Sequence, residues 1–221
     1  MTVVSDLETG SLIEVIDSRQ QEEITKVLMQ QPLEVREAVE EVSVDMWRGF
    51  PTIIETVFPN AQITIDQFHV MKAINDNLDK LRKQIKSPLK IKGARWLILK
   101  NKKDLSPDEL DKLEQLLKTS KRLRKAYNLK EKFRAIYEDI QKPEAAKQRF
   151  KKWLEEARKI YVDAVKTIRN HLDNICNYFL SRTTNGVMKG INNRLKLIKR
   201  QAYGFLNFEN MRRRFLSCFM P

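Results

Sequence analysis

The chain has 221 residues, of which 32% are charged, and its formal net charge is +13. This length suits one large domain or one domain with an insertion, and the two cysteines exclude a disulfide framework and favour a reducing, cytoplasmic compartment. No apolar run approaches the roughly 20 residues of a membrane-spanning helix, so we expect no membrane partner.

Short β-branched runs and helical segments alternate at the start of the chain. Val3-Val4 and Leu12 to Ile16 flank a turn that ends in Gly10, and this pattern predicts a β-hairpin. Ser18 is the expected N-cap of a helix over residues 19–30, and Pro32 is expected to open another.

Two further strands are predicted, and an acidic residue follows each of them. Asp45 comes after Val-Ser-Val, and Asp66 comes after Ile-Thr-Ile, with a helical segment between the two runs. If these strands are parallel, both carboxylates lie at the same edge of an α/β sheet, where such sheets bind ligands. Two carboxylates are the minimum for a divalent-metal site.

Helical spacing of apolar residues dominates from Val70 to Leu180, which predicts an all-α region. Ser106 with Glu109 and Asn128 with Glu131 match capping boxes. Pro143 is expected to open a long helix with a buried aromatic face.

A basic helix over residues 187–201 and a short helix capped by Asn207 are predicted to end the chain. Residues 181–221 contain nine basic residues and one acidic residue, Glu209. Across the whole chain, residues 1–66 hold 4 basic and 13 acidic residues, whereas residues 67–221 hold 38 and 16. Such a basic region attracts polyanions, which indicates DNA or RNA as a partner; a merely solvated basic surface is the alternative.

Four motifs resemble the catalytic domain of insertion-sequence DDE transposases, in the order in which that family has them. They are Asp45-Met-Trp-Arg-Gly-Phe, Phe58-Pro-Asn-Ala, Asp66-Gln-Phe-His-Val and Asn185-Gly-Val-Met-Lys-Gly-Ile-Asn-Asn-Arg. The resemblance covers nearly the whole chain. It implies DNA transposition and recombination, and an α/β fold with an RNase-H-like sheet interrupted by a large all-α insertion, mostly helical overall.

The resemblance also implies a site in which two aspartates and a glutamate hold two Mg²⁺ (or Mn²⁺) ions for in-line phosphoryl transfer. Asp45 matches the family's second aspartate. Asp66 and His69 match an acidic-x-x-His signature beside the site, with Asp66 as a further candidate metal ligand.

Two departures from the family pattern predict an inactive protein. The family glutamate lies in an Asn-Gly-x-x-Glu-Gly-x-Asn motif, and Lys189 stands at its position; a protonated lysine repels Mg²⁺ and cannot coordinate it. The family's first aspartate and its DNA-end-binding segment lie upstream of Met1, so we expect an amino-terminally truncated transposase fragment.

Three domains are expected: an RNase-H-like core without its first strand (1–75), a helical insertion (76–180) and carboxyl-terminal basic helices that complete the core (181–221). The expected DNA contacts are polar or basic residues of the last domain: Arg182, Asn185, Arg194, Lys196, Lys199, Arg200, Arg212, Arg213 and Arg214.

Besides the transposase fragment, two hypotheses stay open. One is a non-enzymatic regulator that binds DNA or pairs with itself or a full-length transposase. The other is a nuclease that recruits another acid, such as Glu55 or Glu209.

Overall fold

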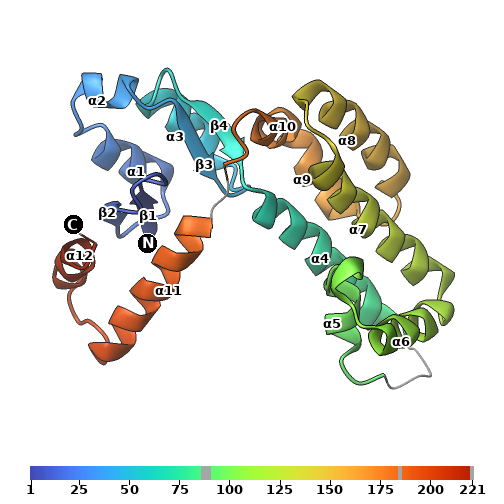
Figure 1. Ribbon diagram of the computed structural model, residues 1–221. Coiled ribbons are helices and arrows are strands. Elements are labelled where there is room, and N and C mark those ends of the chain that lie inside the picture. The colour runs from blue at the N-terminus through green and yellow to red at the C-terminus, as the bar shows by residue number, and fades with distance from the viewer. Residues whose placement is uncertain (86–90, 184–185, 220–221) are drawn as a thin grey trace. The chain divides into compact units, whose positions relative to one another are not determined.

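The computed structural model describes residues 1–85, 91–183 and 186–219, and 66% of these residues are helical, with little sheet (Figure 1). The predicted mostly helical α/β class is therefore confirmed at that coarse level. The contacts divide the chain into two compact units, Met1–Ile63 with Thr183–Pro221 and Thr64–Arg182. We call them the hairpin unit and the helical unit.

The hairpin unit joins the first part of the chain to its last two helices. Its elements are β1 (Thr2–Ser5), β2 (Leu12–Ile16), α1 (Gln21–Leu28), α2 (Leu33–Glu37), β3 (Glu41–Val44), α3 (Gly49–Val57), α11 (Gly186–Gln201) and α12 (Phe208–Ser217). A further strand, β4 (Gln62–Ile65), contains the boundary between the two units.

The predicted hairpin is confirmed. Strands β1 and β2 are antiparallel, with Thr2 opposite Ile16 and Val3 opposite Val15. Gly10 has a φ of +69°, a left-handed conformation that glycine adopts without steric cost, so it can close the turn.

The described strands form two separate two-stranded sheets, β1-β2 and β3-β4, rather than one continuous sheet. At the start of β4, the Gln62 amide donates a hydrogen bond to the carbonyl of Glu40, the residue before β3 (2.8 Å). The predicted element order of the sheet region is correct, whereas an RNase-H-like strand arrangement does not follow from these two pairs. Short pairs of this kind depend on helices packed against their faces, because an isolated two-stranded sheet is marginally stable.

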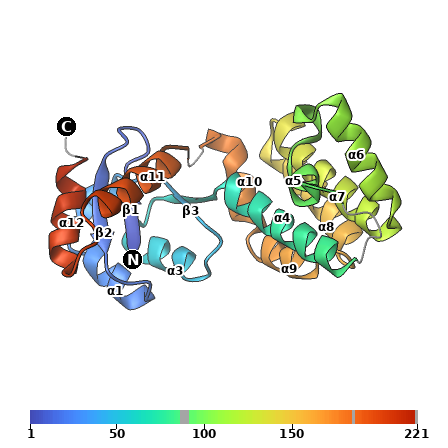
Figure 2. The ribbon, with the colours of Figure 1, turned by 90° about the horizontal axis from the view of Figure 1, so that it is seen from below.

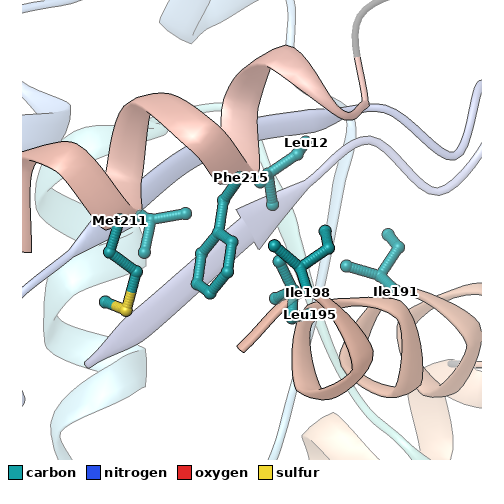
Figure 3. Packing of buried hydrophobic residues seen from close by; sticks show 7 residues of the cluster. Leu12, Ile191, Leu195, Ile198, Met211 and Phe215 are labelled. Atoms are coloured by element: carbon teal, nitrogen blue, oxygen red, sulfur yellow. The ribbon is translucent and has the colours of Figure 1, made fainter. Parts of the chain in front are cut away.

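Helices cover both faces of the hairpin. Successive strand residues point to opposite faces, so Val3 and Val15 contact one cluster and Val4 and Ile16 contact the other. The first cluster joins β2 to α11 and α12, and Figure 3 shows its side chains meeting: Leu12, Ile191, Leu195, Ile198, Met211 and Phe215. The second cluster joins β2 to α1 and α3 through Ile24, Leu28, Ile53 and Val57. Figure 2 shows α12 beside β2. Together with the first cluster, this contact holds α11 and α12 on the hairpin unit.

The helical unit contains the remaining elements. They are α4 (Gln67–Gln84), α5 (Ala94–Leu99), the 3-10 helix η1 (Lys102–Asp104), α6 (Pro107–Lys118), α7 (Lys121–Asp139), α8 (Pro143–Ala157), α9 (Val162–Asn170) and α10 (Leu172–Ser181). Aromatic rings fill its core, where Phe133 contacts Trp153 (centroids 4.7 Å apart) and Phe150 (5.0 Å). The polar edge of Trp153 is also satisfied, because its Nε1 donates to the Leu129 carbonyl (2.7 Å).

The predicted caps were right in two cases and wrong in two. The Ser106–Glu109 capping box at α6 is confirmed, and so is the Asn207 cap of α12. Asn128 is not a cap, because it lies inside the uninterrupted helix α7, whose N-cap is Ser120. Ser18 accepts a bond from the Gln20 amide (2.9 Å) and so shapes the turn before α1 instead of capping the helix.

Lys130 lies buried in α7 and donates to two carbonyls, those of Ile98 (2.8 Å) and Lys100 (3.0 Å), at the end of α5. Burial lowers the pKa of its ammonium, although Glu131 acts in the opposite direction. Its role is to tie α5 to α7. In the described part of the chain, no helix combines the length and apolarity needed to cross a membrane.

Candidate metal centre and nucleic-acid interface

Asp45 lies in a turn directly after β3, in the hairpin unit. Its Oδ1 accepts a bond from the Trp47 amide (2.8 Å), which fixes the orientation of the carboxylate. The Trp47 ring meets Phe50 edge-on, with centroids 4.9 Å apart. A Cβ on Gly49 would lie 2.3 Å from the Trp47 ring, so a larger residue would have to displace the ring. The Asp-Met-Trp-Arg-Gly-Phe motif is therefore a single packed turn that holds Asp45 in place.

Asp66 and His69 form a pair at the start of α4, in the helical unit. The Asp66 side chain is 4% exposed, and its Oδ2 lies 3.1 Å from Nδ1 of His69, which is 37% exposed. The predicted Asp66-x-x-His69 motif thus forms an i, i+3 contact on one helical turn. A carboxylate in this position fixes the orientation of the imidazole ring. Phe68, exposed beside it, meets the ring edge-on (5.6 Å).

Lys189 is exposed on α11, where the resemblance predicts a metal-binding glutamate. Asp45 and Lys189 belong to the hairpin unit, whereas Asp66 and His69 belong to the helical unit. Within the described residues, no three His, Cys, Asp or Glu side chains form a cluster suited to a metal ion. An ammonium in place of a carboxylate does not fit Mg²⁺ or Mn²⁺, which prefer oxygen ligands.

Helix α11 separates an apolar face from a polar one. Its buried residues are Ile191, Leu195 and Ile198, all in the cluster against the hairpin. Lys189, Asn193, Lys196 and Arg200 recur at intervals of four, three and four residues, so they form one stripe on the opposite side, and all four are exposed. We call this the α11 stripe. Over 11 residues it extends about 16 Å along the helix.

Five cations of α11 and α12 have neither an ion pair nor a ring contact in the parts of the chain that the structure describes: Lys189, Lys196, Lys199, Arg200 and Arg214. Arg194 differs, since its guanidinium lies over the Phe219 ring (4.6 Å). These side chains hold positive charge at the surface without local compensation, as a phosphate-binding face requires.

Other predicted DNA contacts have partners within the protein. Arg212 forms a two-bond pair with Glu14, with both N–O distances at 2.6 Å. Arg213 pairs with Glu209 (3.1 Å), which also contacts Arg212. Glu209 thus neutralises arginines at the α12 surface.

Arg182 ends α10 with a φ of +59°, and its guanidinium donates to the carbonyls of Tyr137 (3.2 Å) and Ile140. These bonds tie the end of α10 to the end of α7. Asn185 lies outside the described residues.

Glu14 is a residue whose importance the sequence reasoning missed. It lies in β2 between apolar residues, and burial raises its pKa. Bonds from Arg212 and from the Val15 amide outweigh that effect and leave the pKa below its usual value. A single charge inside a short apolar strand was the available signal, because such a charge needs a partner when it is buried.

Comparison with known proteins gives the family. A family model described as a transposase matches residues 1–215. The transposase for insertion sequence element IS1001 of Bordetella parapertussis is 27% identical over 221 residues, which cover 94% of this chain and 54% of that protein. The transposase for insertion sequence element IS1557 of Mycobacterium tuberculosis is 32% identical over 123 residues, 52% of this chain and 27% of that protein.

These matches place the chain in a class of proteins, the insertion-sequence transposases. Within that class it belongs to the ISL3 family of DDE transposases. The chain spans about half the length of the first of these relatives. No solved structure matches it.

Proposed function

We propose that this chain binds DNA through α11 and α12 and, with Lys189 in place of a carboxylate, does not cleave it. The observation that carries the proposal is the α11 stripe, in which Lys189 is one of three exposed cations on the side opposite the buried face. On this proposal the lysine serves as a phosphate contact rather than as a disabled metal ligand.

The electrostatics of these helices support a sequence-tolerant mode of binding. Phosphate contacts supply most of the non-specific affinity of proteins for DNA, and each one lowers the slope of log K against log salt by about 0.9. If all five unpaired cations contact phosphates, the affinity should fall about 500-fold between 50 and 200 mM salt.

The proposal that the chain does not cleave DNA rests on the carboxylates that would hold a metal ion. The DDE family typically uses a divalent metal, and we propose that its ligands are the carboxylates that the resemblance predicts. In this chain Asp45 is the carboxylate at a matched position, and a bond from the Trp47 amide (2.8 Å) holds it. Lys189 stands at the position of the family's glutamate, so the carboxylate set that a metal-dependent cleavage step requires is incomplete.

The DNA-binding proposal is tested with charge-neutralising variants. Fluorescence anisotropy on a labelled 30-base-pair duplex gives the affinity and its salt slope. Lys196→Gln and Arg200→Gln should each weaken binding and reduce the slope by about one. The matched control is Lys151→Gln, which removes from α8 an exposed cation without an ion pair among the described residues of the helical unit. Equal losses in all three variants would contradict a specific role for α11.

The metal proposal has its own test, which does not require activity. Lys189→Glu restores a carboxylate at the matched position, and titration calorimetry with Mn²⁺ measures the outcome. Tighter Mn²⁺ binding than in the wild type is expected, with Lys189→Gln as the control. If the glutamate variant binds no more tightly than the glutamine variant, the assignment of Lys189 to the family's glutamate position is wrong.

A second function follows from the same features. A protein that keeps a DNA-binding face without a complete carboxylate set competes for DNA with an intact transposase, or joins its assembly and blocks it. Adding this chain to a full-length relative should then lower strand transfer, and the Arg200→Gln variant should inhibit less. Unchanged strand transfer at saturating concentrations would exclude this regulatory role.

A further inference from the structure

The loop between α11 and α12 exposes two large apolar side chains. Tyr203 and Leu206 show 101% and 111% of their reference exposure, the highest values of any large hydrophobic residue that the structure describes. Soluble proteins commonly expose single apolar residues, but two fully exposed ones in four positions form a feature that needs an explanation.

The backbone of this loop is built to present Tyr203. The Gly204 amide donates to the Lys199 carbonyl (3.1 Å), and the Tyr203 amide donates to the Arg200 carbonyl (3.1 Å). These two bonds make a Schellman cap, in which the left-handed residue is usually glycine. Here that residue is Tyr203, with a φ of +52°. Among the described residues, the fully exposed Tyr203 side chain gains no contact in return for this unfavourable conformation, and such outliers cluster at functional positions.

Both ends of the loop are anchored. Phe205 turns inward and meets the Phe215 ring with centroids 6.0 Å apart, within the cluster under the hairpin. Asn207 then starts α12, because its Oδ1 accepts bonds from the amides of Glu209 (2.8 Å) and Asn210 (3.3 Å). The exposed residues therefore extend from a fixed support.

The charge around the loop indicates what covers it. Lys199 and Arg200 lie in the last turn of α11, directly before Tyr203, and no acidic residue occurs between Gly186 and Phe208. A protein partner for an apolar patch does not require this cationic border. Nucleic acid presents both complementary features, namely phosphates for the cations and base faces for an aromatic or aliphatic side chain.

We infer that Tyr203 and Leu206 form a wedge that unstacks DNA bases while the cations of α11 hold the backbone. This inference rests on the proposed DNA binding and adds a contact with base faces. Tyr203 stacks on a base, and Leu206 fills the step that opens beside it. The protein thereby distorts the duplex that it binds and prefers flexible or unpaired segments.

Two measurements on the full chain test the wedge. Anisotropy gives the affinity for a duplex with a central two-base mismatch, and permanganate oxidation of thymines, which attacks the exposed 5,6 double bond, detects unstacking. Wild type should increase thymine reactivity at the bound segment. The Tyr203→Ala/Leu206→Ala double variant should lose this increase and bind about tenfold more weakly. Tyr203→Phe should keep both properties, because the ring remains.

Leu197→Ala is the matched control, since it removes an exposed apolar side chain from α11 outside the loop. It should leave reactivity and affinity unchanged. Because both loop side chains are fully exposed, the double variant should fold, and its circular dichroism should match that of the wild type.

The outcomes separate this inference from the proposed function. If wild type does not bind DNA, the DNA-binding proposal fails and the wedge fails with it. If wild type and the double variant bind equally and give the same thymine pattern, the wedge is wrong and DNA binding stands. A double variant that changes only the sedimentation coefficient would assign the loop to self-association and would also overturn the wedge.

Discussion

The ion pair between Glu14 and Arg212 should stabilise the attachment of α12 to the hairpin, and Glu14→Gln tests this. The pair joins residues 198 positions apart through two bonds of 2.6 Å, with side-chain exposures of 16% and 30%. Bonds to charged groups contribute about 1.5–3 kcal/mol, and partial exposure of Arg212 reduces the Coulombic part. We expect a loss of about 2 kcal/mol, since the substitution removes the two charged bonds and leaves the guanidinium with the longer contact to Glu209 (3.3 Å).

Amide hydrogen exchange followed by mass spectrometry measures this loss locally. A loss of about 2 kcal/mol should speed exchange in peptides covering β2 and α12 by roughly 30-fold. The control is Arg213→Gln in the same helix, whose 74% exposed side chain pairs with Glu209 at the surface. It should change exchange by less than about threefold. Equal effects of Glu14→Gln and Arg213→Gln would show that the Glu14–Arg212 pair stabilises the protein no more than a surface ion pair does.

The Glu14–Arg212 pair also predicts how the stability of the protein changes with pH. The folded-state pKa of Glu14 is below its usual 4.5, so the carboxylate contributes stability above that value, and the contribution is lost as the pH falls through the folded pKa. The difference in stability between wild type and Glu14→Gln should therefore shrink below about pH 4.5.

Two further substitutions test the packing described above. Gly49→Ala should displace the Trp47 ring, because the new Cβ would lie 2.3 Å from it. We expect urea unfolding to show a loss of about 1–3 kcal/mol in stability, together with an altered near-ultraviolet circular dichroism spectrum. An unchanged spectrum would contradict this packing. Lys130→Met should leave the carbonyls of Ile98 and Lys100 without their donor and cost about 2 kcal/mol, seen as faster hydrogen exchange in α5. Since burial lowers the pKa of Lys130, the unfolded chain binds more protons at this group, and the difference in stability between wild type and Lys130→Met should grow as the pH rises toward 10.5.

Local rules predicted much of the secondary structure. The turn at Gly10, the Ser106 capping box and the Asn207 cap each depend on residues within a few positions of one another, so the sequence contains all the information they need. Asn128 failed because its cap signal competes with the continuous apolar face of α7, and burial of that face outweighs a local cap.

Long-range features could not be predicted in this way. The Glu14–Arg212 pair joins β2 to α12, and no local pattern marks the partner of a buried charge. The sequence motif around Asp45 contains Gly49 but does not show that the Trp47 ring lies against it. The stripe that contains Lys189 was visible only as basic composition, because the buried face of α11 had first to be located.

We propose that this chain binds DNA through α11 and α12 and does not cleave it. The most direct test is one gel experiment, in which end-labelled duplex DNA is incubated with the wild-type chain, with and without Mg²⁺ or Mn²⁺, at 50 and 200 mM salt. We predict a shifted complex that weakens strongly at the higher salt and intact DNA in every lane. Metal-dependent cleavage products, or the absence of any complex at 50 mM salt, would contradict the account.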